Sequence, residues 1–168
     1  QHAWQDLETT VRRNDAKLFL ANPPVTSLTR DDLTPMQKFA YDCMVDDKQQ
    51  IVYVSGKAGS GKTTVALIAC NNELKGRVQC AASTAKAAQN FNGPTVHSML
   101  GWSHSAFTDG TGGYSAKKIE ELRTFYEGID VFVIDEADTL SAEQLTRLHI
   151  TMSLIFNPTG KRMANCQL

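Results

Sequence analysis

The stretch VSGKAGSGKTTVALIAC, residues 54–70, decides the fold of this chain. It places three glycines, two lysines and two threonines close together between two apolar segments. Residues 56–63 within it fit the pattern G-x-x-x-x-G-K-[ST], the phosphate-binding loop. A polyphosphate needs several converging N–H donors, and only a backbone without side-chain bulk can approach its oxygens closely. The helix that follows such a loop directs its free amides and positive dipole end toward the anion.

The flanking residues supply the context that this loop requires. Residues 51–54 are apolar and mostly β-branched, which predicts a buried strand, and residues 63–74 predict a helix that ends at Gly76. Lys62 would bring a positive charge to the β- and γ-phosphates, and Thr63 would offer its hydroxyl to Mg²⁺. The alternative is a purely structural glycine turn. We expect the nucleotide to contact Gly56, Lys57, Ala58, Gly59, Ser60, Gly61, Lys62, Thr63 and Thr64.

A second apolar strand, residues 131–134, ends in the adjacent carboxylates of Asp135 and Glu136. Carboxylate oxygen is the ligand that Mg²⁺ prefers, so Asp135 would hold the metal directly or through water. Glu136 would orient or polarise an attacking water. The alternative is a pair of helix-capping acids at a polar strand end. Asp138 is interpreted as a turn or capping residue.

The rest of the pattern alternates strands with helices and predicts an α/β fold with a mostly parallel sheet. Thr34, Pro35 and Gln37 form a capping-box start for a helix that ends near residue 45. Further predicted elements are a strand at 78–82, helices at 85–91, 95–100, 116–126 and 141–155, a short helix within 4–20 and a loop at 103–115. Residues 157–168 show no clear period.

The composition sets outer limits on function. The 168 residues, 42% hydrophobic with a net charge of −1, suit one domain with a full core and give no global basic field for nucleic acid. Four scattered cysteines without a C-x-x-C pair favour reduced core thiols over disulfides or a metal site. No segment reaches the length of a transmembrane span or has the pattern of a signal peptide.

Four short stretches together resemble one family. They are Leu33-Thr34-Pro35-Met36-Gln37, the segment 83–88, Thr95-Val96-His97-Ser98 with Leu100-Gly101, and Asp135-Glu136-Ala137-Asp138. With the phosphate loop, they are similar to the first RecA-like lobe of superfamily 1B DNA helicases, the PIF/RecD-like group. The resemblance covers about residues 33–148. It implies a three-layer P-loop NTPase lobe at 31–168, preceded by an N-terminal extension at 1–30.

The resemblance also implies roles for individual residues. Gln37 would recognise adenine, although the capping box is an alternative use of the same side chain. The stretch from Ser83 through Thr84 to Lys86 would contact the DNA backbone, or else cap a helix beside a solvated lysine. Thr95 and His97 would belong to the nucleic-acid site, with a core or surface histidine as the alternative. Trp102 and Phe107 could stack on bases or serve as packing residues.

By this resemblance the parent protein is an ATP-dependent DNA helicase. It would couple Mg-ATP hydrolysis to 5′-to-3′ translocation on single-stranded DNA, with a second RecA-like lobe as partner and no membrane. We find no third sensor motif and no arginine candidate to reach the γ-phosphate, so we expect a fragment that is inactive alone. Two alternatives stay open: another P-loop enzyme such as a small-molecule kinase, and a nucleotide-gated single-strand-binding module without catalysis.

Overall fold

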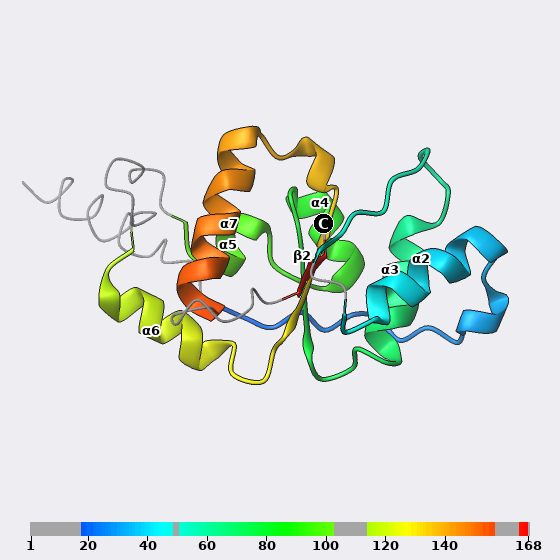
Figure 1. The fold of residues 1–168 in the computed structure, drawn as a ribbon, viewed down its shortest axis with the longest axis horizontal. Coiled ribbons are helices and arrows are strands. Elements are labelled where there is room, and N and C mark those ends of the chain that lie inside the picture. Colours follow the sequence, from blue (N-terminus) through cyan, green and yellow to red (C-terminus); the bar gives the residue numbers. More distant parts are fainter. Residues whose placement is uncertain (1–17, 49–50, 103–113, 157–164, 168) are drawn as a thin grey trace, which may run out of the picture.

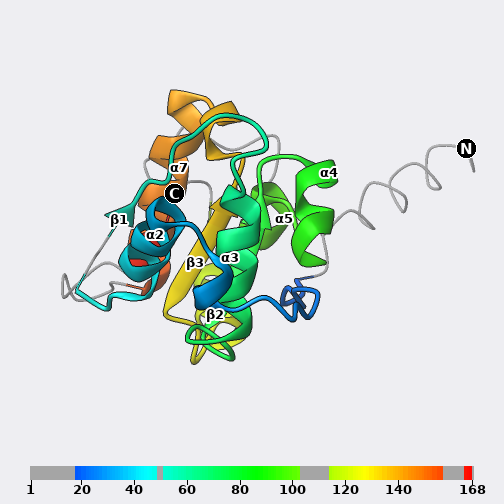
Figure 2. The ribbon, with the colours of Figure 1, turned by 90° about the vertical axis from the view of Figure 1, so that its right-hand side faces the viewer.

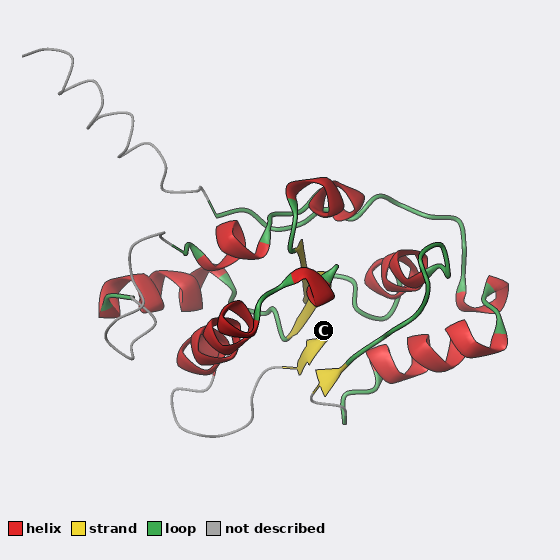
Figure 3. Cartoon of the chain, turned by 90° about the horizontal axis from the view of Figure 1, so that it is seen from above, coloured by secondary structure: helices red, strands yellow, loops and turns green. Residues whose placement is uncertain are grey.

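The computed structural model describes residues 18–48, 51–102, 114–156 and 165–167. Within these ranges a parallel sheet with the strand order β1-β4-β3-β2 forms the centre of the molecule (Figure 1). Viewed from above, the strands lie between helices on both sides (Figure 3). The strands are β1 Ile51–Val52, β2 Val78–Ala82, β3 Val131–Asp135 and β4 Asn165–Gln167.

Helices cover both faces of this sheet. In Figure 1, α2 and α3 lie on one side of it, and α5, α6 and α7 lie on the other. The helices are α2 Pro35–Val45, α3 Lys62–Asn71, α4 Ala85–Ala88, α5 Val96–Leu100, α6 Ala116–Phe125 and α7 Ala142–Phe156. Short 3₁₀ turns are η1 Arg30–Asp32, η2 Gln89–Phe91 and η3 Ala137–Thr139. The result is the predicted three-layer α/β sandwich.

The two central strands bury side chains on both faces. Cys80 and Val133 pack in one core with residues of α2 and α3. Ala81 and Phe132 pack in the other core with residues of α5, α6 and α7. Because both faces of β2 and β3 are covered, neither strand shows a strict alternation of apolar and polar residues: Val131 to Ile134 are all apolar, and Gln79 is the polar exception in β2.

The sulfur atoms of Cys70 on α3 and Cys80 on β2 lie 3.3 Å apart in the first of these cores. The pKa of the Cys80 thiol is raised by its hydrogen bond with Cys70 and by burial. Both are free thiols, as is Cys43. Cys70 and Cys80 therefore fit the prediction of reduced core thiols, whereas Cys43 is only half-buried.

The helix starts follow from local capping. Thr34 N–H donates to Gln37 Oε1 at 2.9 Å and Thr34 Oγ1 accepts from Gln37 N–H at 3.4 Å, which confirms the capping box of α2. Ser141 and Gln144 make the same reciprocal pair before α7. Such pairs satisfy amides that the first turn of a helix leaves free.

The strand prediction for residues 51–54 is wrong in extent and in burial. Only Ile51–Val52 form β1, and the side chains of Ile51 and Tyr53 are 52% and 62% exposed. Within the described residues β1 lies at the edge of the sheet and pairs only with β4. A strand at an edge leaves part of its apolar surface uncovered, which the local sequence pattern cannot reveal.

The remaining differences concern one short strand and two segments that the structure describes only in part. β4 was not predicted, because a strand of three residues is too short to show a period. The predicted helix within 4–20 and the predicted loop at 103–115 lie mostly outside the described residues; of the former, residues 18–20 are not helical. The described part of the N-terminal extension is fastened to the sheet, since Ala21 N–H donates to the buried Gln79 Oε1 at 2.9 Å.

Candidate nucleotide-binding site

A cavity of about 480 Å³ lies where β1 and β3 end. It is lined by the phosphate loop, by the residues that follow β3, and by Asn90 and Phe91 of η2. Figure 2 shows residues 53–61 as a teal arch that rises from β1 and descends into α3. Ligands of open α/β sheets bind at this carboxyl edge of the strands.

The backbone of this arch requires glycine at two points. Gly59 and Gly61 have φ angles of +75° and +84°, in the left-handed region that side chains rarely adopt. A Cβ on Gly56 would stand 2.9 Å from Ser60 Oγ, so a larger residue there would require the Ser60 hydroxyl to move. Ser60 N–H donates to the carbonyl of Lys57 at 3.1 Å and completes the turn.

Lys62 folds its side chain back over the loop. Its Nζ donates to the carbonyl oxygen of Gly56 at 2.7 Å and to that of Lys57 at 3.2 Å. Lys62, Gly56 and Gly59 all line the cavity, so the positive charge stands among the backbone groups that the motif assigns to phosphate. Thr64 follows in the first turn of α3.

Thr63 and Asp135 meet although 72 residues separate them in the chain. Thr63 Oγ1 donates to Asp135 Oδ2 at 3.0 Å, and both residues line the cavity. Two adjacent oxygens of this kind fit a hard divalent cation. The described residues contain no group of three or more His, Cys, Asp and Glu able to hold a metal. A magnesium ion would therefore take further oxygens from the nucleotide.

Glu136 has a strained backbone. Its φ of +54° is uncommon outside glycine and costs about 1–2 kcal/mol. Its N–H donates to Asp135 Oδ1 at 3.0 Å, and its Oε2 accepts from Thr84 Oγ1 at 3.0 Å. A strained residue held by neighbours on both sides is typical of functional sites.

The predicted DNA-contact segment touches this acidic pair directly. Thr84 both donates to Glu136 and caps α4, because its Oγ1 accepts from Ala87 N–H at 3.2 Å. Ser83 N–H donates to the carbonyl of Asp135 at 3.2 Å. Lys86 lies exposed on α4. The helix-cap alternative for this segment is therefore confirmed for Thr84, and it leaves the DNA contact untested.

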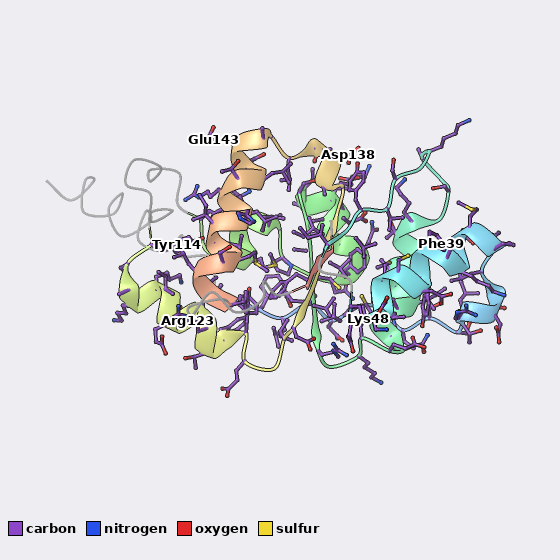
Figure 4. All side chains as sticks on the ribbon, in the orientation of Figure 1. Phe39, Lys48, Tyr114, Arg123, Asp138 and Glu143 are labelled. Atoms are coloured by element: carbon purple, nitrogen blue, oxygen red, sulfur yellow. The ribbon has the colours of Figure 1, made fainter. Side chains whose placement is uncertain are left out.

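Several residues that line the cavity were not predicted as site residues from the sequence. The Thr139 hydroxyl donates to the carbonyl of Glu136 and shares a second hydrogen bond with the Ser83 hydroxyl, and Thr139 lines the cavity together with Asn90 and Phe91. A signal existed for Thr139: if β2 and β3 are neighbours in a parallel sheet, the residues after both strands must meet. Asp138, read as a turn residue, also lines the cavity and lies along the upper edge in Figure 4.

Thr95 lies beside the carboxyl end of β2, and His97 follows it in α5. Thr95 forms an isolated bridge with Ala82 and caps α5 by accepting from Ser98 N–H at 3.3 Å. The His97 ring stands edge-on to Trp102, with their centroids 4.9 Å apart. Trp102 is only 8% exposed and has the guanidinium of Arg147 over its ring, so it is a packing residue. Phe107 lies outside the described residues.

Gln37 contacts the phosphate loop from outside. Besides its capping role, its Nε2 donates to the carbonyl of Ser60 at 3.0 Å. Gln37 is not among the residues that line the cavity. Adenine recognition by Gln37 stays a prediction. In the structure the amide oxygen of Gln37 accepts from Thr34 N–H and its amide nitrogen donates to the Ser60 carbonyl.

Comparisons with known proteins identify a family and a fold for this chain. The family model described as an AAA domain matches residues 32–153, more than half of the chain. No curated protein matches this chain. No described helix has the length and apolar character needed to cross a membrane.

Two solved structures share the fold. A crystal structure of Pif1 from a Bacteroides species, in complex with ADP-AlF4, is 24% identical over 80% of this chain, with a TM-score of 0.63. Unliganded Pif1 from the same source is 26% identical over 80% of this chain, with a TM-score of 0.58. The match spans 31% and 30% of those chains, so this chain corresponds to about a third of their length. The chain therefore belongs to the AAA-domain family, with the P-loop fold of a Pif1-like RecA-like lobe.

Proposed function

We propose that this chain is the ATP-binding lobe of an ATP-dependent DNA helicase. Mg-ATP hydrolysis in the cavity is coupled to movement along single-stranded DNA, in the 5′-to-3′ direction, and to unwinding of the duplex. The observation that carries the proposal is the contact between Thr63 and Asp135 beside the phosphate loop. Family membership and the Pif1-like fold support it.

The residues of the chain divide the chemistry between them. The amides of residues 56–63 bind the phosphates, and Lys62 offsets the charge that grows on the β- and γ-phosphates during transfer. Thr63 and Asp135 would hold Mg²⁺, which neutralises phosphate charge when bound. Glu136 orients the attacking water and accepts its proton.

Coupling to DNA follows from the neighbourhood of Glu136. Ser83, Thr84 and Lys86 come directly after β2, and two of them contact the acidic pair or its backbone. A single strand bound at Thr84 contacts a residue that itself donates a hydrogen bond to Glu136, the residue that orients the attacking water. Hydrolysis and DNA occupancy therefore influence each other in this proposal.

Unwinding needs two lobes that open and close around the nucleotide. The described residues form one such lobe. We therefore expect the 168-residue chain to bind Mg-ATP weakly, to hydrolyse it barely and to unwind nothing. The second RecA-like lobe is the partner that would complete the motor.

The experiment measures ATP hydrolysis and ATP binding with and without single-stranded DNA, in the chain and in a protein that carries both lobes. DNA-stimulated release of inorganic phosphate by the two-lobed protein is expected. Transfer of the phosphoryl group to a small-molecule acceptor would favour a kinase instead. Retention of the biological role in Glu136→Gln would favour a non-catalytic binding module.

A further inference from the structure

The N-terminal segment, defined here as residues 19–24, lies beside β2. Within the described residues β2 is an edge strand of the sheet. In Figure 2 the segment belongs to the blue part of the chain, which passes below α4 and α5. Residues 18–29 form no helix or strand, so the backbone groups of the segment need partners from other parts of the chain.

Gln79 binds the backbone of this segment. Its side chain is fully buried in β2, whose other residues are apolar. Its Oε1 accepts from Ala21 N–H at 2.9 Å, and its Nε2 donates to the Phe19 carbonyl at 3.4 Å. A buried amide is costly unless its donor and its acceptor are both satisfied. The N-terminal segment therefore explains why this apolar strand tolerates a glutamine.

The same segment holds the turn that precedes α5. Asn22 N–H donates to the Asn92 carbonyl at 3.4 Å, and Asn92 Nδ2 donates to the Asn22 carbonyl at 3.1 Å. One residue later, a Cβ on Gly93 would stand 2.8 Å from the Cys80 carbonyl oxygen and 3.0 Å from Ala21 Cβ. The turn is therefore enclosed between β2 and the N-terminal segment.

This turn leads directly to two residues of the predicted nucleic-acid site. The Pro94 carbonyl accepts from Ala82 N–H at 3.3 Å, and Thr95 forms a bridge with Ala82. Thr95 then caps α5, in which His97 follows. The end of β2 and the N-terminal segment together fix where α5 begins.

We propose that Gln79 and Asn92 are positioning residues for the nucleic-acid site. Through the N-terminal segment they hold the turn at 92–95, so that Thr95 and His97 are in place before a single strand binds. The inference rests on the proposed DNA-binding function and on the predicted role of these two residues. If the segment is released, binding of single-stranded DNA must also order the turn, and its affinity falls. Binding of Mg-ATP is unchanged, because residues 19–24 do not line the nucleotide cavity.

The test uses Gln79→Leu and Asn92→Asp, which release the segment at two different contacts. Leucine has no group for Ala21 N–H or the Phe19 carbonyl, and aspartate has no proton for the Asn22 carbonyl at neutral pH. Anisotropy measures the affinity for a fluorescent oligothymidylate, and calorimetry measures the affinity for Mg-ATP. We expect the oligothymidylate affinity to fall by about threefold to tenfold in each variant, as for one lost hydrogen bond. The Mg-ATP affinity should stay within about twofold of the wild type.

Asn71→Asp is the matched control. Asn71 Nδ2 donates to the Pro24 carbonyl at 3.1 Å, so this variant loses a hydrogen bond to the same segment, at the end that lies against α3. It also gains the same charge as Asn92→Asp. Its oligothymidylate affinity should stay within about twofold of the wild type. If Gln79→Leu does not fold, as judged by circular dichroism, Asn92→Gly replaces it, because glycine keeps the left-handed turn and lacks the amide.

Three results would overturn the inference. They are an equal loss of oligothymidylate affinity in Asn71→Asp, an unchanged oligothymidylate affinity in either test variant, and a parallel loss of Mg-ATP affinity.

A second readout separates this inference from the proposed function. If the wild type bound no oligothymidylate, the proposed DNA-binding function would fail. The positioning role is then measured without DNA, from amide hydrogen exchange of Met99, whose N–H donates to the Thr95 carbonyl at 2.8 Å. Exchange about threefold to tenfold faster in Asn92→Asp, with the rate of Val65 beside the phosphate loop unchanged, supports the role. Equal Met99 rates in the variant and the wild type contradict it.

Discussion

At the scale of single residues, Asp135 contacts two residues to which the proposed function gives different roles. Its two carboxylate oxygens accept from Thr63 and from the Glu136 amide, so one side chain organises both neighbours. Glu136 is held through its other end by Thr84. The two adjacent acids therefore have different partners, and their substitution should have different effects.

Asp135→Asn keeps the shape of the side chain and removes its charge. We expect the affinity for ATP in the presence of Mg²⁺ to fall by about tenfold to a hundredfold, the range typical of losing a residue that supports a metal site. In EDTA the affinity should stay unchanged, because the phosphate loop itself is intact. Calorimetry with and without Mg²⁺ measures both values.

Glu136→Gln is the control, since it makes the same change one residue later. Its Mg-ATP affinity should stay within about twofold of the wild type, because Glu136 is assigned to the water and not to the metal. An equal loss in both variants, or a loss that persists in EDTA, would contradict the assignment of Asp135.

At the scale of elements, two threonines begin short helices in the same way. Thr84 caps α4 and Thr95 caps α5, each through a hydroxyl oxygen that accepts a backbone N–H. Only Thr84 has a further hydrogen bond to Glu136. The pair therefore distinguishes the capping role from the contact with the acidic residue.

A double-mutant cycle measures this contact. Thr84→Val and Thr95→Val should each lower the free energy of unfolding by about 1 kcal/mol, the usual loss for a cap. Combined with Glu136→Ala, Thr84→Val should be non-additive by about 0.5–1.5 kcal/mol, while Thr95→Val should be additive. Urea denaturation gives all the values. Equal coupling for both threonines would show that the Thr84 contact contributes nothing specific.

The elements also show what the sequence can predict. The helices α2 and α7 were predicted together with their starts, because a capping box lies within four consecutive residues. β2 and β3 were predicted because burial on both faces makes most of their residues apolar. β1 was expected to be buried and β4 was missed, because edge position and pairing depend on residues far away in the chain.

The same difference between local patterns and long-range contacts holds within the site. Lys62, Thr63 and Asp135 were predicted because a motif fixes their chemistry. The contact of Thr84 with Glu136 was not predicted, because it requires β2 to lie beside β3, and the order of strands in a sheet is not written in any local pattern. The contact of Thr139 with Ser83 was not predicted for the same reason.

At the scale of the whole molecule, two buried tyrosines join the helix layer of α5, α6 and α7. Tyr114 donates to the carbonyl of Leu100 at 2.7 Å, and Tyr126 donates to that of Met99 at 2.6 Å. Burial raises the pKa of Tyr114 from 10 to about 12 and also raises the pKa of Tyr126. The folded state therefore keeps these hydroxyls protonated at pH values where the unfolded chain has lost the protons.

This linkage predicts instability in base. Since the folded pKa exceeds the unfolded one, the contribution of Tyr114 is fully present below pH 10 and is lost as the pH rises through about 12. The raised pKa of Tyr126 acts in the same direction. The free energy of unfolding should fall over this window. Tyr114→Phe should make the fall less steep, although it also removes the bond to Leu100. Urea denaturation at pH 9 to 12 checks this, and an equal slope in both proteins would contradict it.

The account depends on one arrangement: the amides of residues 56–63 around a triphosphate, with Thr63 and Asp135 at its metal. The most direct measurement is a crystal structure of the chain with a non-hydrolysable ATP analogue and Mg²⁺. We predict phosphates inside the loop, Lys62 on the β- and γ-phosphates, and Mg²⁺ between Thr63 and Asp135. A nucleotide bound elsewhere, or a metal that touches neither residue, would contradict the account.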